Sequence, residues 1–171
     1  MASFFRTYRT TKDGTRIDGV FAMAFIHNGE YFLTHISIYQ DGMIDCWGLV
    51  DFEEFKRKVR SGWVVTQPPK DARVSVSFLA SFTAADASYW IEPEEFIKEV
   101  ADEIEGLNGR PTTSDRCREA WAAYEASPSE ATKEALRVAY EAMPKHQRRC
   151  VLYDQDRKDG PIRAVLYRHE H

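Results

Sequence analysis

The sequence predicts an α+β fold, with an antiparallel β-meander in the N-terminal half packed with a helical C-terminal half that contains an αα-hairpin. Short apolar runs in the first half are separated by Asp-Gly and Asn-Gly pairs, which is typical of hairpins. Apolar residues in the second half recur at helical spacing. At 171 residues, we expect one domain over 1–171, with a β-rich lobe at 1–90 and a mostly helical lobe at 91–171.

The first strands are defined by three turns, at Asp13-Gly14, Asn28-Gly29 and Asp41-Gly42. Such pairs suit two-residue hairpin turns, because both turn residues must adopt a positive φ. The runs between the turns place four strands near residues 4–10, 17–27, 31–39 and 43–47.

Two more strands are expected, at 63–66 and at 73–78. In the second, Val74, Val76 and Phe78 alternate with serines. Strict alternation predicts that these three side chains share the buried face of a half-buried strand.

A short helix is expected over 51–62, where Asp51 is a suitable N-cap residue and Glu54 completes a capping pattern. An acidic helix begins at Pro93, a residue favoured in the first helical position, and stops at Gly106. The segment 106–113 that follows is the best candidate for a hinge between lobes.

The αα-hairpin is expected from a helix over 113–126 and a second helix opened by a capping box at Ser127 and Glu130. Two alternatives remain for the tail. It forms either a hairpin that turns at Asp159-Gly160, or a helix to about Cys150 followed by one strand.

Composition excludes several classes of protein. A net charge of −4 argues against a nucleic-acid binder driven by bulk charge. Three widely spaced cysteines, Cys46, Cys117 and Cys150, indicate reduced thiols in a cytoplasmic protein. The sequence has no apolar segment of membrane-spanning length and no glycine-rich nucleotide motif, so we expect neither a membrane partner nor a cofactor.

The stretch 41–64 raises the first candidate catalytic site. Asp45 is not explained by a turn or a helix cap, and the adjacent Cys46 is a possible nucleophile if His35 or His146 lowers the pKa of its thiol. A buried, inert cysteine at a sheet-to-helix corner is the commoner arrangement, and we favour it.

A second candidate site is the acidic segment 154–160. Asp154 and Asp156 resemble the start of a calcium loop, but the positions that need Gly and a bidentate Glu hold other residues. Together with Lys158 they also resemble a fragment of metal-dependent nucleases. A charged turn explains the same residues, and we expect no metal. The nearby cluster 145–149, KHQRR, is a weak candidate for phosphate contact.

The remaining candidates suit protein binding. The acidic helix 92–105 places Glu95, Glu99 and Asp102 on one side, and acidic surfaces speed encounter with basic partners. Trp47 and Trp63 bracket the short helix and are either core residues or aromatic anchors for a partner.

Three stretches of the chain are YQDGMIDCWGLVDFEEFKRKVRSGWV, LNGRPTTSDRC and DQDRKDGPIR. They resemble a family of uncharacterised bacterial cytosolic proteins. The resemblance implies a bacterial, cytoplasmic protein and assigns no catalytic residue.

We therefore expect a non-enzymatic protein-binding module, in concrete form a bacterial inhibitor or immunity-type protein that blocks a partner protein. The alternative is a metal-dependent or cysteine-based hydrolase or nuclease that uses Asp45 with Cys46, or Asp154 and Asp156 with Lys158. The identity of the partner and the oligomeric state do not follow from the sequence.

Overall fold

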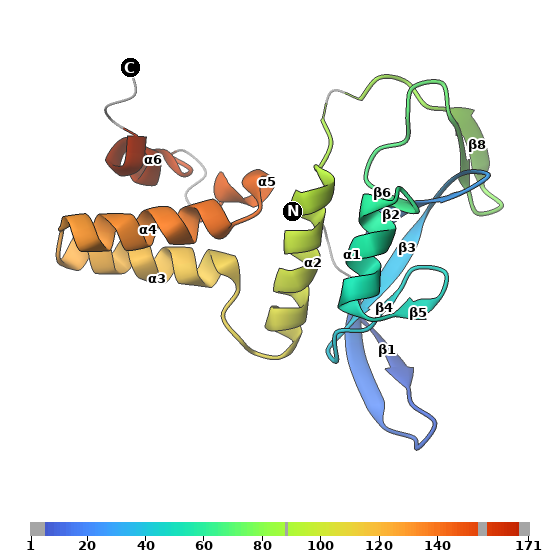
Figure 1. Ribbon diagram of the computed structural model, residues 1–171, viewed down its shortest axis with the longest axis horizontal. Coiled ribbons are helices and arrows are strands. Elements are labelled where there is room, and N and C mark those ends of the chain that lie inside the picture. The colour runs from blue at the N-terminus through green and yellow to red at the C-terminus, as the bar shows by residue number, and fades with distance from the viewer. Residues whose placement is uncertain (1–5, 88, 154–156, 168–171) are drawn as a thin grey trace. The chain divides into compact units, whose positions relative to one another are not determined.

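The computed structural model describes residues 6–87, 89–153 and 157–167, and its helices and strands are shown in Figure 1. The predicted α+β class is confirmed, with strands first and helices afterwards. The chain divides into two compact units, Met1–Asn108 and Gly109–His171. Their border lies within the segment 106–113, and the first helix after residue 90 belongs to the N-terminal unit. Whether the units fold as one domain stays a prediction.

The N-terminal unit contains one eight-stranded sheet. Consecutive strands are antiparallel neighbours in the order β1-β2-β3-β4-β5, which confirms the predicted meander of four strands and adds β5, which was not predicted. Their bounds are β1 Arg6–Thr10, β2 Arg16–Asn28, β3 Glu30–Tyr39, β4 Ile44–Asp45 and β5 Leu49–Val50. The predicted strand 43–47 is shorter than expected, because the chain already turns at residues 46–48 to form β5.

Three further strands extend the sheet: β6 Val64–Val65, β7 Arg73–Val76 and β8 Ala80–Thr83. The first pairs with β2, while β7 lies parallel to β3 and antiparallel to β8. Local turn signals do not reveal the parallel pairing, because it joins segments about 40 residues apart, such as Tyr31 and Val74.

Phe78 corrects the prediction for residues 73–78. Strand β7 ends at Val76, and Leu79 N donates to Val76 O (2.8 Å) to close a turn into β8, a strand that we did not predict. Phe78 stands in this turn with a φ of 55° and a fully exposed side chain. Alternation places a side chain on a face only while the chain remains extended.

The predicted turns occur, but glycine alone adopts the left-handed conformation in each. Gly14, Gly29 and Gly42 have φ values of 87°, 78° and 82°, whereas the residues that precede them do not have positive φ. Gly19 is required for a different reason. A Cβ there would lie 2.6 Å from Ile38 O and 2.7 Å from the Tyr39 ring, because that ring packs over the glycine.

Helices α1 (Phe52–Arg60) and α2 (Pro93–Leu107) lie on one side of the sheet (Figure 1). The predicted cap of α1 is confirmed, since Asp51 Oδ1 accepts a hydrogen bond from Glu54 N (2.8 Å). Between helices and strands lies the first core, whose main members are Val20, Ala22, Ala24, Ile26, Ile36, Ile38, Ile44, Phe55, Val64, Phe96 and Val100.

The C-terminal unit is helical and has its own core. Its helices are α3 Thr113–Ala126, α4 Glu130–Ala142, α5 Lys145–Arg148 and α6 Gly160–Tyr167. The αα-hairpin of α3 and α4 is confirmed. The capping box predicted at Ser127 and Glu130 is wrong by two residues. Ser129 caps α4, and Thr132 is its reciprocal partner. Buried members of the core are Cys117, Leu136, Tyr140, Met143, Val151 and Ile162.

Neither alternative for the tail is correct, because residues 160–167 form helix α6. Ile162 is completely buried in the second core, and Val165 and Leu166 pack against that core at the next helical turn. The spacings of three and four residues follow a helix, whereas a strand would require alternation.

Candidate functional site

Asp45 has a structural role in the turn between β4 and β5. Its Oδ1 accepts a hydrogen bond from Gly48 N (3.0 Å), which holds the turn that carries Cys46 and Trp47. Asp41, in the turn before β4, forms an ion pair with Arg9. These contacts explain both carboxylates as turn and surface groups.

Cys46 is completely buried in the first core. Burial raises the pKa of its thiol to about 11, so that at neutral pH the sulfur is protonated and poorly nucleophilic. His35, one histidine considered as its base, is exposed and pairs with Met23 on the opposite side of the sheet. The structure thus favours an inert cysteine at this corner.

The second candidate site is only partly within the described structure. Asp154 and Asp156 lie outside the described residues, so a metal site that uses them stays a prediction. Lys158 is described, has a φ of 55°, and lines a pocket of the C-terminal unit that is rich in Lys and Arg.

The three acidic residues of α2 considered for partner binding are buried, whereas Glu94 of the same helix is exposed and pairs with Arg60. Glu95, Glu99 and Asp102 are only 6%, 6% and 7% exposed, and Glu95 accepts a hydrogen bond from Lys98 Nζ (3.0 Å). Beside them, burial and then the carboxylates of Glu99 and Asp102 raise the pKa of Glu103 to about 7. An acidic face that attracts a basic partner requires charges in water, so these residues are poorly placed for that role.

The two tryptophans have different environments. Trp63 packs partly buried against the first core, donates from Nε1 to Cys46 O (3.4 Å), and lies 4.8 Å from Lys58 Nζ. Trp47 is 47% exposed, has a φ of 64°, and contacts the Phe32 ring at a centroid distance of 5.1 Å. Of the two, Trp47 is the one whose indole is accessible to a partner.

The side of the sheet that faces away from α1 and α2 carries a group of apolar side chains, although the exposed His35 and the completely buried Val74 lie on the same side. Phe21, Met23 and Phe25 of β2 lie on it, because they alternate with the core residues of that strand. Register pairing adds Leu33, Val76 and Phe82 from β3, β7 and β8, through the pairs Phe25↔Leu33, Leu33↔Val76 and Val74↔Phe82. We call these six residues the open sheet face.

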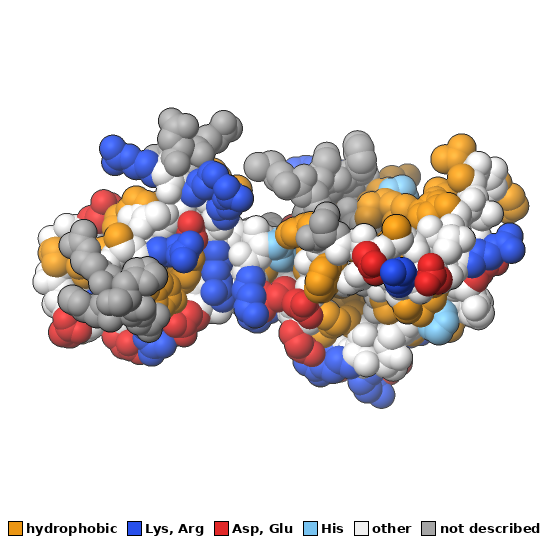
Figure 2. Space-filling view, turned by 90° about the horizontal axis from the view of Figure 1, so that it is seen from above, with side chains coloured by type: hydrophobic (Ala, Val, Ile, Leu, Met, Phe, Trp, Pro, Cys, Tyr) orange, Lys and Arg blue, Asp and Glu red, His pale blue; other side chains and the backbone are white. Residues whose placement is uncertain are grey.

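Within the residues that the structure describes, no helix of the N-terminal unit covers the open sheet face (Figure 1). Met23 is 51% exposed and Phe82 is 50% exposed. In the turn of the β7–β8 hairpin, which also carries Phe82, Phe78 and Leu79 are 113% and 81% exposed. Figure 2 shows hydrophobic side chains gathered at this β7–β8 end of the unit.

This surface was not predicted from the sequence, although β2 contains a signal for it. Residues 20–26, VFAMAFI, are apolar at every position, so both faces of the strand are apolar. Such a run usually belongs to a strand covered on both sides. Here one side packs under the helices and the other forms part of the open sheet face.

Comparisons with known proteins support the division into two units. Residues 6–111 match the family model of a domain of unknown function, DUF7638, and residues 112–171 match that of another domain of unknown function, DUF7639. The border between the two matches lies close to Gly109, where the second unit begins. Neither a curated protein nor a solved structure matches the chain significantly. Among the described helices, none combines the length and the hydropathy needed to cross a bilayer.

Proposed function

The chain belongs to the family of the domain of unknown function DUF7638, and we propose that it is a non-enzymatic protein-binding module that binds its partner on the open sheet face. The observation that carries the proposal is the exposure of four apolar side chains, Met23 and Phe82 on the open sheet face and Phe78 and Leu79 beside it. Groups of exposed apolar side chains on a folded protein mark interaction sites.

The composition of the face also suits protein recognition. Phe and Met are enriched at the centres of interfaces, where charged residues are depleted. Two histidines lie next to aromatic residues of the sheet. The His27 ring stacks on the Tyr31 ring with 4.4 Å between centroids, and the centroids of the His35 and Phe21 rings are 5.2 Å apart. A partner with an apolar surface, such as one side of an amphipathic helix, fits a sheet face of this kind.

More specifically, we propose that this protein-binding module is a bacterial inhibitor of the immunity type that acts in the cytoplasm. An inhibitor works by covering part of its partner and needs no catalytic group of its own. The buried thiol of Cys46 and the turn role of Asp45 are compatible with that. The open sheet face takes the place of the acidic helix 92–105 as the proposed contact surface.

The proposal is tested by affinity capture from the native host with the purified chain as bait. The double variant Met23→Ser/Phe82→Ser removes apolar contacts from the face, while Val138→Ser changes an equally exposed apolar residue on α4 (56% exposed). We expect the wild type and Val138→Ser to retain a stoichiometric protein partner. The double variant should bind it at least about 30-fold more weakly, since loss of a central contact often costs 2 kcal/mol or more.

Circular dichroism confirms that each bait is folded, and light scattering after gel filtration measures its oligomeric state. Retention of the partner by the double variant with unchanged affinity would place the contact elsewhere and refute the proposal. A wild-type dimer that the double variant converts to a monomer would instead identify a second copy of the chain as the occupant, and would also reject the inhibitor form.

A further inference from the structure

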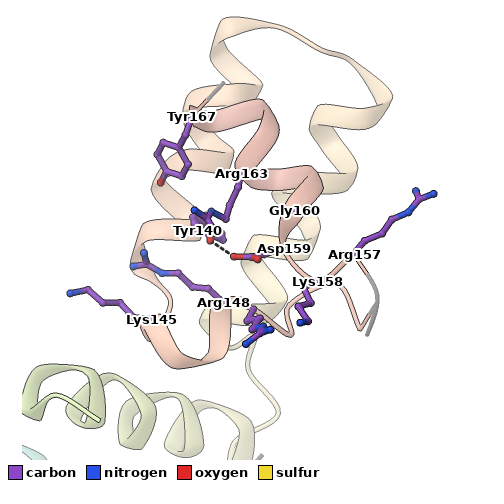
Figure 3. A pocket seen from close by; sticks show the side chains of 10 residues that line it. Tyr140, Lys145, Arg148, Arg157, Lys158, Asp159, Gly160, Arg163 and Tyr167 are labelled. Atoms are coloured by element: carbon purple, nitrogen blue, oxygen red, sulfur yellow. Dashed lines mark hydrogen bonds between the residues drawn. The ribbon is translucent and has the colours of Figure 1, made fainter. Parts of the chain in front are cut away.

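The C-terminal unit contains a cavity of about 880 Å³ lined mainly by cationic side chains. The lining comes from the end of α4, from α5 and the residues after it, and from α6 with the residues before it (Figure 3). The Lys and Arg residues that line it are Lys145, Arg148, Arg149, Arg157, Lys158 and Arg163. Among the described residues, Asp159 is the one acid in the lining.

Arg148 is held in position by the end of helix α4. Its Nη2 donates to Glu141 O (2.9 Å) and its Nε to Met143 O (3.3 Å), and its guanidinium lies 5.1 Å from the centre of the Tyr140 ring. These bonds fix the plane of the guanidinium and leave Nη1 for a further acceptor. A guanidinium held in this way offers the N–H groups of Nη1 to an acceptor in a fixed direction, and such charge-assisted hydrogen bonds are strong toward phosphate oxygens.

The single acid of the lining is already engaged. Asp159 accepts a hydrogen bond from the Tyr140 hydroxyl at 2.5 Å, and the two side chains point toward each other beside Arg163 (Figure 3). Burial, followed by this carboxylate, raises the pKa of the Tyr140 phenol, so the phenol remains a donor. Within the part of the chain that the structure describes, Arg149, Lys158 and Arg163 form no ion pair.

Several cations around one hollow repel one another, and an anion bound between them relieves that repulsion. We propose that this pocket binds a small anion that carries two or more phosphate groups. One phosphate balances at most two of the cations, whereas a polyphosphate carries enough negative charge to balance several of those that line the hollow. The cavity is within the usual size of small-molecule sites, which supports a compact ligand.

Nucleic acid fits the same chemistry less well. A nucleic-acid footprint is normally a strip of basic side chains along one face. Here the cations converge on a single hollow from residues 145–163, and the chain as a whole carries a net charge of −4. In Figure 3 Arg157 extends away from the other labelled cations, and Lys145 extends in the opposite direction.

The test is calorimetric titration of the full chain with pyrophosphate, ATP and orthophosphate. Lys158→Glu and Arg163→Glu reverse charges in the pocket, Arg163→Gln removes one charge, and Lys133→Glu reverses a charge on α4 that does not line the pocket. We expect pyrophosphate and ATP to bind at least tenfold more tightly than orthophosphate. Each pocket variant should weaken them by about tenfold or more, because charge-assisted hydrogen bonds are lost. Lys133→Glu should bind like the wild type.

Comparison of the affinities for pyrophosphate and ATP shows which part of the ligand the pocket recognises. Equal affinity for pyrophosphate and ATP identifies the phosphate chain as the recognised group, and tighter binding of ATP adds contacts to the nucleoside. Absence of binding at millimolar concentration, or equal affinities in all variants, overturns the proposal. So does a single-stranded oligonucleotide that binds more tightly than ATP and is weakened by Lys133→Glu, since that pattern describes an extended surface. Circular dichroism and thermal melting show whether each variant is folded.

Discussion

The three cysteines show how differently one residue type behaves in different surroundings. Cys46 and Cys117 are completely buried, each in its own core, whereas Cys150 is exposed. Burial is the main reason that the pKa of both Cys46 and Cys117 is raised to about 11. The same feature that makes them good core residues therefore removes them from nucleophilic chemistry.

We predict that one thiol reacts rapidly with a disulfide reagent at pH 8, and that it is Cys150. A pKa about two units above that of a free thiol lowers the thiolate fraction roughly 100-fold, and burial slows the other two thiols further. Cys150→Ser should abolish the rapid phase of labelling. In the wild type, denaturant should make two further thiols reactive, those of Cys46 and Cys117. Rapid labelling of Cys46 in the native protein would revive the cysteine-based alternative.

At the scale of elements, the start of a helix depends on which serine or threonine hydroxyl accepts a hydrogen bond from a backbone N–H of the first turn. Thr112 caps α3 with Asp115 as its reciprocal partner, and hydrogen bonds from Thr112 hold the pKa of the Asp115 carboxyl below its usual range. Ser129 and Thr132 make the equivalent pair at α4. Because Ser127 carries the same hydroxyl two residues earlier, the sequence alone offers two possible starts for α4.

We predict that Ser129→Ala lowers the free energy of unfolding of the C-terminal unit by about 1 kcal/mol, the usual cost of removing a cap. Ser127→Ala is the matched control and should change it by less than about 0.5 kcal/mol, as for an ordinary surface substitution. Urea denaturation followed by circular dichroism measures both values. A larger loss from Ser127→Ala would support the capping box expected from the sequence.

At the scale of the whole molecule, the described residues form two hydrophobic cores with no residue in common. The first includes Phe55 and Val100 under the sheet, and the second includes Leu136 and Ile162 among the helices. The family matches divide the chain close to the same place. Separate cores are the usual condition for separate unfolding.

We predict two transitions in scanning calorimetry of the full chain. Leu136→Ala should lower the midpoint of one transition and Phe55→Ala that of the other, since truncation of a buried Leu or Phe to Ala typically costs about 2–5 kcal/mol. One cooperative transition that both substitutions shift equally would show that residues 1–171 fold as the single domain expected from the sequence.

The sequence by itself determined what depends on neighbours along the chain. The meander of β1 to β4, the Asp51 cap of α1 and the αα-hairpin all follow from short turns, caps and local periodicity. Such features need only a few consecutive residues, so they are visible before any tertiary contact is known.

Tertiary structure decided what depends on distant partners. The pairing of β7 with β3, the burial of Glu95, Glu99 and Asp102, and the turn that exposes Phe78 all involve the surroundings of a residue as well as its type. The open sheet face became visible because pairing brings β2, β3, β7 and β8 together. The basic pocket emerged in the same way, because folding gathers cations from both sides of residue 150 around one hollow. A sequence gives the charge and hydropathy of each side chain, but exposure and proximity are properties of the folded chain.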